Sequence, residues 1–339
     1  MISEITEKEQ WDKILLEIGK YDCYHTFEYH NICSEVGNTP ILLEYRSKNL
    51  LIALPLILRP IEGTDYFDFT SVYGYPGPIH NGKLTEEARL TFQESLTSYF
   101  FDKKVVSVFS RLNPFIGEQE STLENLGTIE YLGDVVNIDL TKDIELQRQL
   151  FSKTTKRYLN KTRRLCYTKK SNDLDDIQVF MDLYYENMDR VNAKKLYYFD
   201  KDYFVKLANS QTFKTEIIYA VLQETDEIIS AAMMFKTNDI VQYHISGTKN
   251  DYLHMTPIRL LLDETRIDGS NEGFTFFNLG GGLGSEEDSL FQFKASFSKD
   301  FKAFKVWKHI VDETVYETLV KEKEIQDTGT NFFPKYRHS

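Results

Sequence analysis

The sequence predicts an α/β (α+β) protein made of two tandem domains, each with a mixed sheet covered by helices. Its 339 residues are enough for about two domains of ordinary size. A hydrophobic content of 41%, with 14% aromatic residues, is ample for two cores. The order helices, three-strand meander, helix, strand occurs twice along the chain, with almost no sequence identity between the halves. This repeat favours a duplicated domain.

In the first half, Thr6 and Glu9 have the spacing of a capping box ahead of a helix with an apolar stripe. A second, short helix is predicted over 27–36. Thr85 is the predicted cap of a helix that ends near Phe101. Runs of apolar and β-branched residues predict strands, over 40–46, 50–58, 66–73 and 105–110.

The second half repeats this order. Helical spacing of apolar residues predicts a helix over 171–188, and Thr256 with Pro257 begins another that runs to about Ile267. A charged helix follows near the end, over 316–323. Strands are predicted in this half over 215–222, 228–235 and 240–246, and from Phe274.

Composition limits the function classes. The formal charge of −12 argues against a DNA-binding coat, and the longest apolar run, 50–58, is too short to span a bilayer. The first residues have no leader pattern, so a cytoplasmic protein is expected. Cys23, Cys33 and Cys166 are odd in number and contain no C-x-x-C pair, which predicts neither a disulfide framework nor a metal site.

The most informative segment is a glycine turn after a predicted buried strand. Gly280, Gly281 and Gly282 allow a ligand to approach the backbone, and Ser285 with Asp288 predicts a capping box for the next helix. The pattern lacks the G-x-G-x-x-G and GK[ST] signatures, which excludes dinucleotide and P-loop sites. We interpret it as a turn that aims Lys294 at a pocket; the alternative is a packing lysine on an amphipathic helix.

A second feature is the basic segment 153–170, which has eight Lys or Arg residues and no acid. Lys153, Arg157, Lys161 and Arg164 form one stripe at helical spacing. Such a stripe suits the phosphates of a nucleotide diphosphate, CoA or RNA. The alternative is a solvated helix face.

Strand alternation over 240–246 predicts Tyr243 with Ile245 on one face, and His244 with Ser246 on the other. His244 is the candidate general base, or else a hydrogen-bonded structural histidine. Two further sets are candidates for a sugar or peptide platform, with ordinary turn and helix-end roles as the alternative: Tyr73, Tyr75 and His80 around the YGYPGP turn, and Asp189 with Arg190.

Several local matches in one order resemble the Fem family of peptidyltransferases and their GNAT-fold acyltransferase relatives. They cover nearly the whole chain: the helix with Trp11, then YHTFEYH (24–30), YGYPGPI (73–79), the basic segment, NMDR (187–190), YYF (197–199) and the terminal GGG…FKxxF.

The resemblance implies two GNAT-like domains, 1–145 plus 306–339 and 146–305, and acyl transfer to a primary amine with no metal. It implies that Lys294 lies beside the reacting acyl group and that the basic segment lies near phosphates. The acceptor side would include Tyr73, Tyr75, His80, Asn81, Asp189, Arg190 and Tyr243. Pro76 and Asn81 replace an arginine and an acid that are usual in the peptidoglycan members, so another amine is plausible as the acceptor.

The leading hypothesis is therefore an N-acyltransferase for a cell-envelope precursor: an amino sugar, a polysaccharide or a peptidoglycan peptide. The co-substrate is acyl-CoA or an aminoacyl-tRNA, and the single basic segment favours the smaller carrier. No tightly bound cofactor is expected. The alternative is a non-catalytic binding module of the same fold, which gains support if Lys294 and His244 lie on opposite sides.

Overall fold

The computed structural model describes residues 1–323 and 332–338. The chain divides into two compact units, which we call unit 1 (1–132 with 303–339) and unit 2 (133–302). The sequence suggests that 133–145 belong to the first domain and 303–305 to the second. In the structure, 133–145 belong to unit 2 and 303–305 to unit 1.

Unit 1 contains a mixed sheet whose strands run in the order β1-β2-β3-β4-β6-β13, with β5 paired to β3. Strands β2, β3 and β4 form an antiparallel meander, and β4 pairs with β6 in parallel after the crossover helix α3. The elements are β1 (Ile2–Ile5), α1 (Lys8–Ile18), α2 (Phe27–Cys33), β2 (Thr39–Arg46), β3 (Leu50–Pro60), β4 (Phe67–Thr70), β5 (Ile79–Gly82), α3 (Glu86–Asp102), β6 (Val105–Arg111), α4 (Gln119–Thr122), β13 (Asp300–Ile310) and α11 (Glu313–Glu322).

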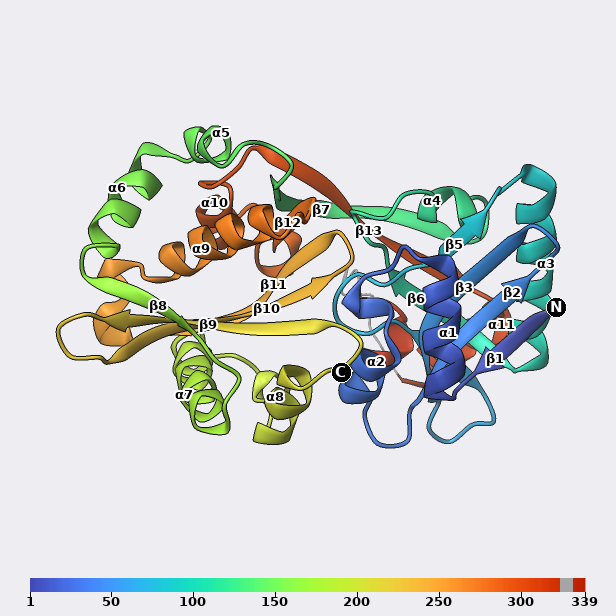
Figure 1. The fold of residues 1–339 in the computed structure, drawn as a ribbon. Coiled ribbons are helices and arrows are strands. Elements are labelled where there is room, and N and C mark those ends of the chain that lie inside the picture. The colour runs from blue at the N-terminus through green and yellow to red at the C-terminus, as the bar shows by residue number, and fades with distance from the viewer. Residues whose placement is uncertain (324–331, 339) are drawn as a thin grey trace. The chain divides into compact units, whose positions relative to one another are not determined.

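The sheet strands of unit 2 run in the order β7-β12-β11-β10-β9-β8, with parallel and antiparallel pairs. In Figure 1, α9 and α10 lie on one face of this sheet and α7 and α8 on the other. The elements are β7 (Thr128–Asp139), α5 (Ile144–Gln149), α6 (Lys153–Thr162), β8 (Cys166–Lys170), α7 (Leu174–Arg190), α8 (Lys201–Ala208), β9 (Lys214–Leu222), β10 (Ile228–Thr237), β11 (Ile240–Thr248), α9 (Ile258–Asn271), β12 (Phe276–Gly280) and α10 (Ser289–Lys294).

The two units repeat one topology, strand, two helices, antiparallel meander, crossover helix, parallel strand. The predicted duplicated α/β fold is confirmed. Two strands pair with partners that are distant in the chain: β13 pairs antiparallel with β6, and β7 pairs antiparallel with β12. The last segment therefore returns to the first unit, as the family resemblance implies.

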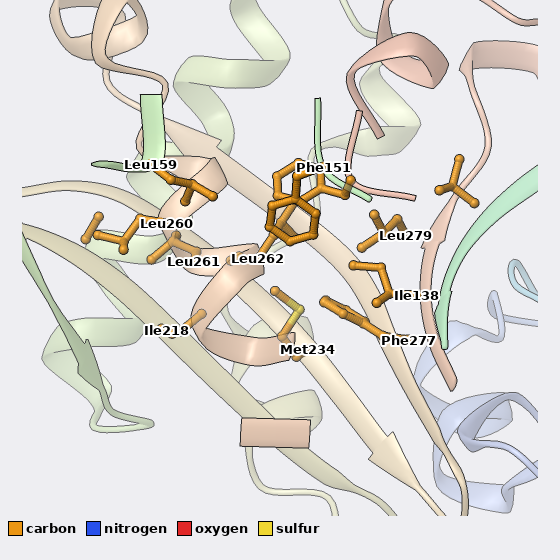
Figure 2. Close-up of a cluster of buried hydrophobic side chains, with 14 of the residues drawn as sticks. Ile138, Phe151, Leu159, Ile218, Met234, Leu260, Leu261, Leu262, Phe277 and Leu279 are labelled. Atoms are coloured by element: carbon orange, nitrogen blue, oxygen red, sulfur yellow. The ribbon is translucent and has the colours of Figure 1, made fainter. Parts of the chain in front are cut away.

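The core of unit 2 lies between the sheet and helices α6, α9 and α10. Figure 2 shows Leu260, Leu261 and Leu262 of α9 among side chains from the strands, including Met234 and Phe277. Burying such side chains contributes about 1.5–3 kcal/mol each. This packing fixes α9 and the residues that precede it against the sheet.

Three predicted helix starts differ from the structure. Helix α1 has Glu7 at its N-cap with no side-chain hydrogen bond, so the predicted capping box at Thr6 is wrong. Helix α10 begins at Ser289, and Asp288 itself is the cap, accepting a hydrogen bond from the Phe291 N–H. Helix α9 begins at Ile258, with Pro257 at its N-cap position and no side-chain cap, so the predicted cap at Thr256 is wrong.

Candidate active site in unit 2

The site candidate lies where two parallel strands stop pairing. Strands β11 and β12 pair only from Ile240 to Gln242 and from Phe276 to Asn278, although β11 continues to Thr248. Ligands of open α/β sheets bind at the carboxyl ends of parallel strands. The residues that follow these strand ends are therefore the ones to inspect.

Lys294 ends helix α10 and is only 8% exposed. Its ammonium donates a hydrogen bond of 2.6 Å to the carbonyl oxygen of Gly281 and forms no ion pair with a described residue. Burial lowers the pKa of Lys294 from 10.5 to about 8, against a smaller opposing effect of the Asp288 carboxylate. The side chain is still mostly charged at pH 7, with two N–H groups left for a ligand.

The glycine turn has a tight structure of its own. A Cβ on Gly282 would lie 1.9 Å from the Glu286 carbonyl oxygen, and one on Gly281 would lie 2.9 Å from the Asp134 carbonyl oxygen. Both glycines are therefore required by packing inside the turn. The Asp288 carboxylate closes the turn by accepting the Leu283 N–H as well as capping α10. The consequence is a fixed Gly281 carbonyl that orients Lys294.

Tyr243 lies beside Lys294, whose Nζ is 5.9 Å from the centre of the tyrosine ring. The Tyr243 hydroxyl is hydrogen-bonded to the Ser246 hydroxyl. Burial raises the pKa of Tyr243 to about 12, so the phenol stays protonated at neutral pH. Lys294, Tyr243 and Ser246 thus form one polar cluster next to the apolar core under α9 and α10.

His244 lies on the opposite face of the sheet. Strand β11 has a β-bulge at this point. Met233 of β10 pairs with Ile245 and Met234 pairs with Tyr243, so His244 is the inserted residue of the bulge. Its ring contacts Phe235 at a centroid distance of 4.3 Å, and its Nε2 is 3.3 Å from the hydroxyl of Tyr203 in α8. The prediction that His244 shares a face with Ser246 is wrong, since the bulge interrupts the alternation.

Burial lowers the pKa of His244 to about 3. A general base is most effective when its pKa is near the working pH. The position of His244 on the other face of the sheet and its low basicity therefore both separate it from Lys294.

Arg259 is a residue that the sequence did not single out. It is the second residue of α9, whose N-terminus has no side-chain cap. Its guanidinium lies 4.8 Å from the ring centre of Phe293 in α10 and 5.3 Å from that of Tyr158 in α6. Its Nε is buried without a hydrogen-bond partner, as is the hydroxyl of Thr256. The sequence signal that could have pointed to Arg259 is its position two residues after Pro257, the proline at the predicted start of the helix.

The basic segment is helical only as far as Thr162, after which residues 166–170 form strand β8. The stripe Lys153, Arg157 and Lys161 lies on the exposed side of α6, and Arg164 follows in the turn. These four have no acidic partner among the residues that the structure describes; the other basic residues of the segment bond to other groups.

In unit 1, the side chains near the YGYPGP turn have mixed surroundings. Tyr73 is 65% exposed, with the Arg111 guanidinium 5.7 Å from its ring centre. Tyr75 packs edge-on against Tyr24 and Phe304. In β5, His80 Nε2 lies 3.4 Å from the Glu118 carboxylate, and the Asn81 side-chain amide donates to the Glu17 carbonyl.

Asp189 and Arg190 do not pair with each other. Asp189 accepts a hydrogen bond of 2.7 Å from the Tyr198 hydroxyl, and Arg190 donates to the Asn250 side chain at 2.8 Å. These contacts tie the end of α7 to the loop before α8 and to the segment after β11. Tyr198 in turn packs against Tyr185, within an aromatic cluster on the same face as His244.

Comparison with known proteins gives the class of fold. No protein-family model and no curated protein matches the sequence. Among solved structures, the chain is similar to FemX, with a TM-score of 0.72 and 11% identity over 93% of this chain and 99% of that one. The expected Fem-type, GNAT-like fold is confirmed.

Two further structures are similar. One is the C-terminal domain of an Agrobacterium fabrum protein described as a lysylphosphatidylglycerol synthetase, with a TM-score of 0.57 and 14% identity over 96% of this chain and 99% of that one. The other is a Bacteroides thetaiotaomicron protein of unknown function, with a TM-score of 0.56 and 11% identity over 91% of this chain and 100% of that one. At these identities the likeness concerns the fold.

Proposed function

We propose that the protein is an N-acyltransferase that moves an acyl or aminoacyl group from a phosphate-bearing carrier to a primary amine. One observation carries the proposal. Lys294 is a buried ammonium that forms no ion pair within the described part of the chain, positioned by the Gly281 carbonyl at the carboxyl ends of the parallel strands β11 and β12. Burying an ammonium in this way costs stability, and such groups cluster at functional sites.

In acyl transfer, the amine nitrogen attacks the carbonyl carbon, the carbonyl oxygen gains negative charge, and the bond to the carrier oxygen or sulfur then breaks. The oxygen needs hydrogen-bond donors in a dry site. Lys294 has two N–H groups that the Gly281 bond does not use. Its positive charge, at a pKa of about 8, is largely retained at pH 7.

The proton lost by the amine goes to a group other than His244 in this proposal. The pKa of about 3 makes the imidazole a weak base, and the ring lies on the face away from Lys294. The Tyr243 and Ser246 hydroxyls are a hydrogen-bonded pair on the Lys294 face and can return a proton to the leaving group or to water. His244 is left as part of the aromatic wall on the α8 face.

For the carrier, the N-terminus of α9 is the favoured phosphate site. Helix N-termini attract anions, and Arg259 adds a cation with an unbonded, buried Nε beside it. Phe293 links the two groups, since it contacts Arg259 and directly precedes Lys294 in α10. Acyl-CoA and aminoacyl-tRNA both end in a reactive acyl group carried by phosphates, so both remain candidate donors.

The acceptor is proposed to be the amine of a cell-envelope precursor, by analogy with the names of FemX and of the lysylphosphatidylglycerol synthetase. Of the acceptor contacts predicted from the sequence, Tyr243 lies beside Lys294 in unit 2. Tyr73, Tyr75, His80 and Asn81 of unit 1, and Asp189 and Arg190 of unit 2, stay predictions. The separation of Lys294 from His244 favours a second candidate, a binding module that has kept the fold but not the chemistry.

A ligand panel tests the carrier assignment. We expect CoA thioesters, or a short 3′-aminoacylated RNA, to raise the melting temperature of the wild type and not that of Arg259→Gln. Lys206→Gln is the matched control, because Lys206 lies on α8 and pairs with Asp202. Equal stabilisation of all three proteins would remove Arg259 from the site. No stabilisation of the wild type by any carrier would contradict the proposed function.

A further inference from the structure

The outer side of α5 and α6 combines cations without acidic partners and exposed leucines. We define the α5–α6 surface as Leu146, Leu150, Lys153, Lys161 and Arg164. Leu146 of α5 is 53% exposed, and Leu150, the C-cap residue that follows α5 with helical backbone angles, is 48% exposed. Their spacing of four places them on the same side of this turn. Lys153 and Lys161 lie two turns apart on the exposed side of α6.

The two helices that carry these residues are tied together. Arg148 of α5 donates a hydrogen bond of 2.8 Å to the Asn160 side chain of α6, and Lys156 donates one of 2.9 Å to the Gln149 carbonyl. Behind α6, Leu159 is fully buried in the core of unit 2. In Figure 1, α5 and α6 lie at an outer edge of unit 2. Leu159 thus occupies the inner side of α6, whereas the five residues of the α5–α6 surface are exposed.

The α5–α6 surface carries positive charge, whereas the chain as a whole is negatively charged. The protein has a formal charge of −12, yet none of Lys153, Lys161 and Arg164 has an acidic partner among the described residues. By contrast, Arg163 is paired to Asp263 at 2.8 Å and Lys169 to Asp176 at 2.8 Å. The unpaired cations are those that point outward.

We propose that the α5–α6 surface docks on an anionic lipid bilayer. Lysine and arginine near an anionic leaflet each strengthen binding several-fold, and apolar side chains on the same surface enter the interface. The two leucines decide between a bilayer and RNA, because contacts to an RNA backbone need cations and do not need exposed leucines. No helix of the described residues is long and apolar enough to cross a bilayer, so the contact is peripheral.

Docking of this kind is independent of the proposed transfer chemistry, since it uses neither Lys294 nor Arg259. It would bring unit 2 to a surface at which lipid-linked amines are presented. A soluble acceptor would gain nothing from it.

Vesicle co-sedimentation tests the proposal with the full chain. The wild type is expected to bind vesicles of phosphatidylglycerol and phosphatidylcholine, to bind pure phosphatidylcholine at least about tenfold more weakly, and to lose affinity as salt rises. Lys153→Gln with Lys161→Gln and Arg164→Gln should raise the Kd for the mixed vesicles about 100-fold, at about 1 kcal/mol per cation. Leu146→Ser with Leu150→Ser should raise it about tenfold.

Matched controls lie in unit 1. Lys20→Gln with Lys48→Gln and Lys83→Gln makes the same change in net charge at exposed positions, and Leu16→Ser with Leu90→Ser removes two exposed leucines. Both controls should bind vesicles like the wild type. Equal weakening by the controls, or no binding of the wild type to anionic vesicles, would overturn the proposal.

RNA is the competing partner and has its own outcome. If the leucine variant binds vesicles like the wild type while the cation variant loses binding to a short RNA duplex, the surface is an RNA contact and the lipid proposal is wrong. Melting temperatures within about 3 °C of the wild type confirm that each variant is folded.

Discussion

Replacing Lys294 by methionine should separate chemistry from packing. The alkyl chain of methionine can fill the space of the lysine stem, while the ammonium is lost. If that ammonium stabilises the charge on the acyl oxygen, turnover should fall by roughly 10²–10³, the usual loss for one oxyanion donor. The assay is acyl transfer under saturating donor and acceptor, with product measured by mass spectrometry.

The expected stability change follows from two opposing effects. Lowering the pKa of Lys294 from 10.5 to about 8 means that the folded state holds the charged form at a cost of about 3 kcal/mol. Methionine removes this cost but also removes the charge-assisted hydrogen bond to Gly281, which contributes about 1.5–3 kcal/mol. The two effects nearly cancel, so the melting temperature should stay within about 3 °C.

The pH dependence supplies an independent check. Because the folded pKa lies below the unfolded one, the unfolded chain binds more protons between pH 8 and 10.5, and the stability of the wild type should rise with pH in that window. Turnover should fall above pH 8 as the ammonium is lost. Lys294→Met should show neither effect.

Lys236→Met is the matched control, since Lys236 is also buried in unit 2 but pairs with Glu216 and Glu272. It should lose about 1.5–3 kcal/mol of stability, because its charge-assisted contacts are lost while Glu216 keeps Lys170 at 3.0 Å and Glu272 keeps Lys214, and it should keep the turnover of the folded fraction. Unchanged turnover with a lower melting temperature in Lys294→Met would refute the assigned chemistry and make Lys294 a packing residue.

Three further predictions concern other sites. His25 and His30 are fully buried, and burial lowers their pKa values to about 3 and about 4. The free energy of unfolding should therefore fall as the pH drops below 6.5, by about 4 kcal/mol for the pair at pH 5. Urea unfolding at pH 7 and at pH 5 measures this, and an equal midpoint at the two pH values would contradict it. Gly282→Ala should lower the free energy of unfolding by at least about 2 kcal/mol more than Gly284→Ala does. The added Cβ at position 284 has open space around it, so that variant is destabilised only by the positive φ; equal losses of stability would mean that the turn adapts. His244→Phe should lower turnover less than about tenfold, whereas a loss above about 1,000-fold would restore the histidine as the base.

The sequence predicts the fold well because the elements are long and periodic. Strand β3 is a run of apolar residues buried from Leu50 to Leu58, and Thr85 caps α3 as predicted. What the sequence does not contain is pairing between distant segments. The return of β13 to β6 was available only from the family resemblance, because no local pattern fixes which sheet a late strand joins.

For the candidate site, the sequence singled out Lys294 and Tyr243, which lie side by side in the structure, but grouped His244 with Ser246 incorrectly. A bulge opposite Met233 and Met234 shifts the alternation by one residue, and nothing in the composition of β11 indicates it. The three glycines were interpreted as a ligand approach, whereas Gly281 and Gly282 are required by contacts with Asp134 and Glu286. Arg259 was missed because its partners, Tyr158 and Phe293, come from two other helices.

The most direct test of the central claim asks whether the wild-type chain forms a product at all. The donor that raises the melting temperature is incubated with amino sugars, a UDP-linked muramyl peptide and an amine-bearing lipid, and the mixture is analysed by mass spectrometry for an amine that has gained the acyl mass. Our account predicts an N-acylated product whose formation depends on both donor and enzyme. Tight donor binding with no acylated amine above the enzyme-free rate would contradict it and identify the protein as a binding module.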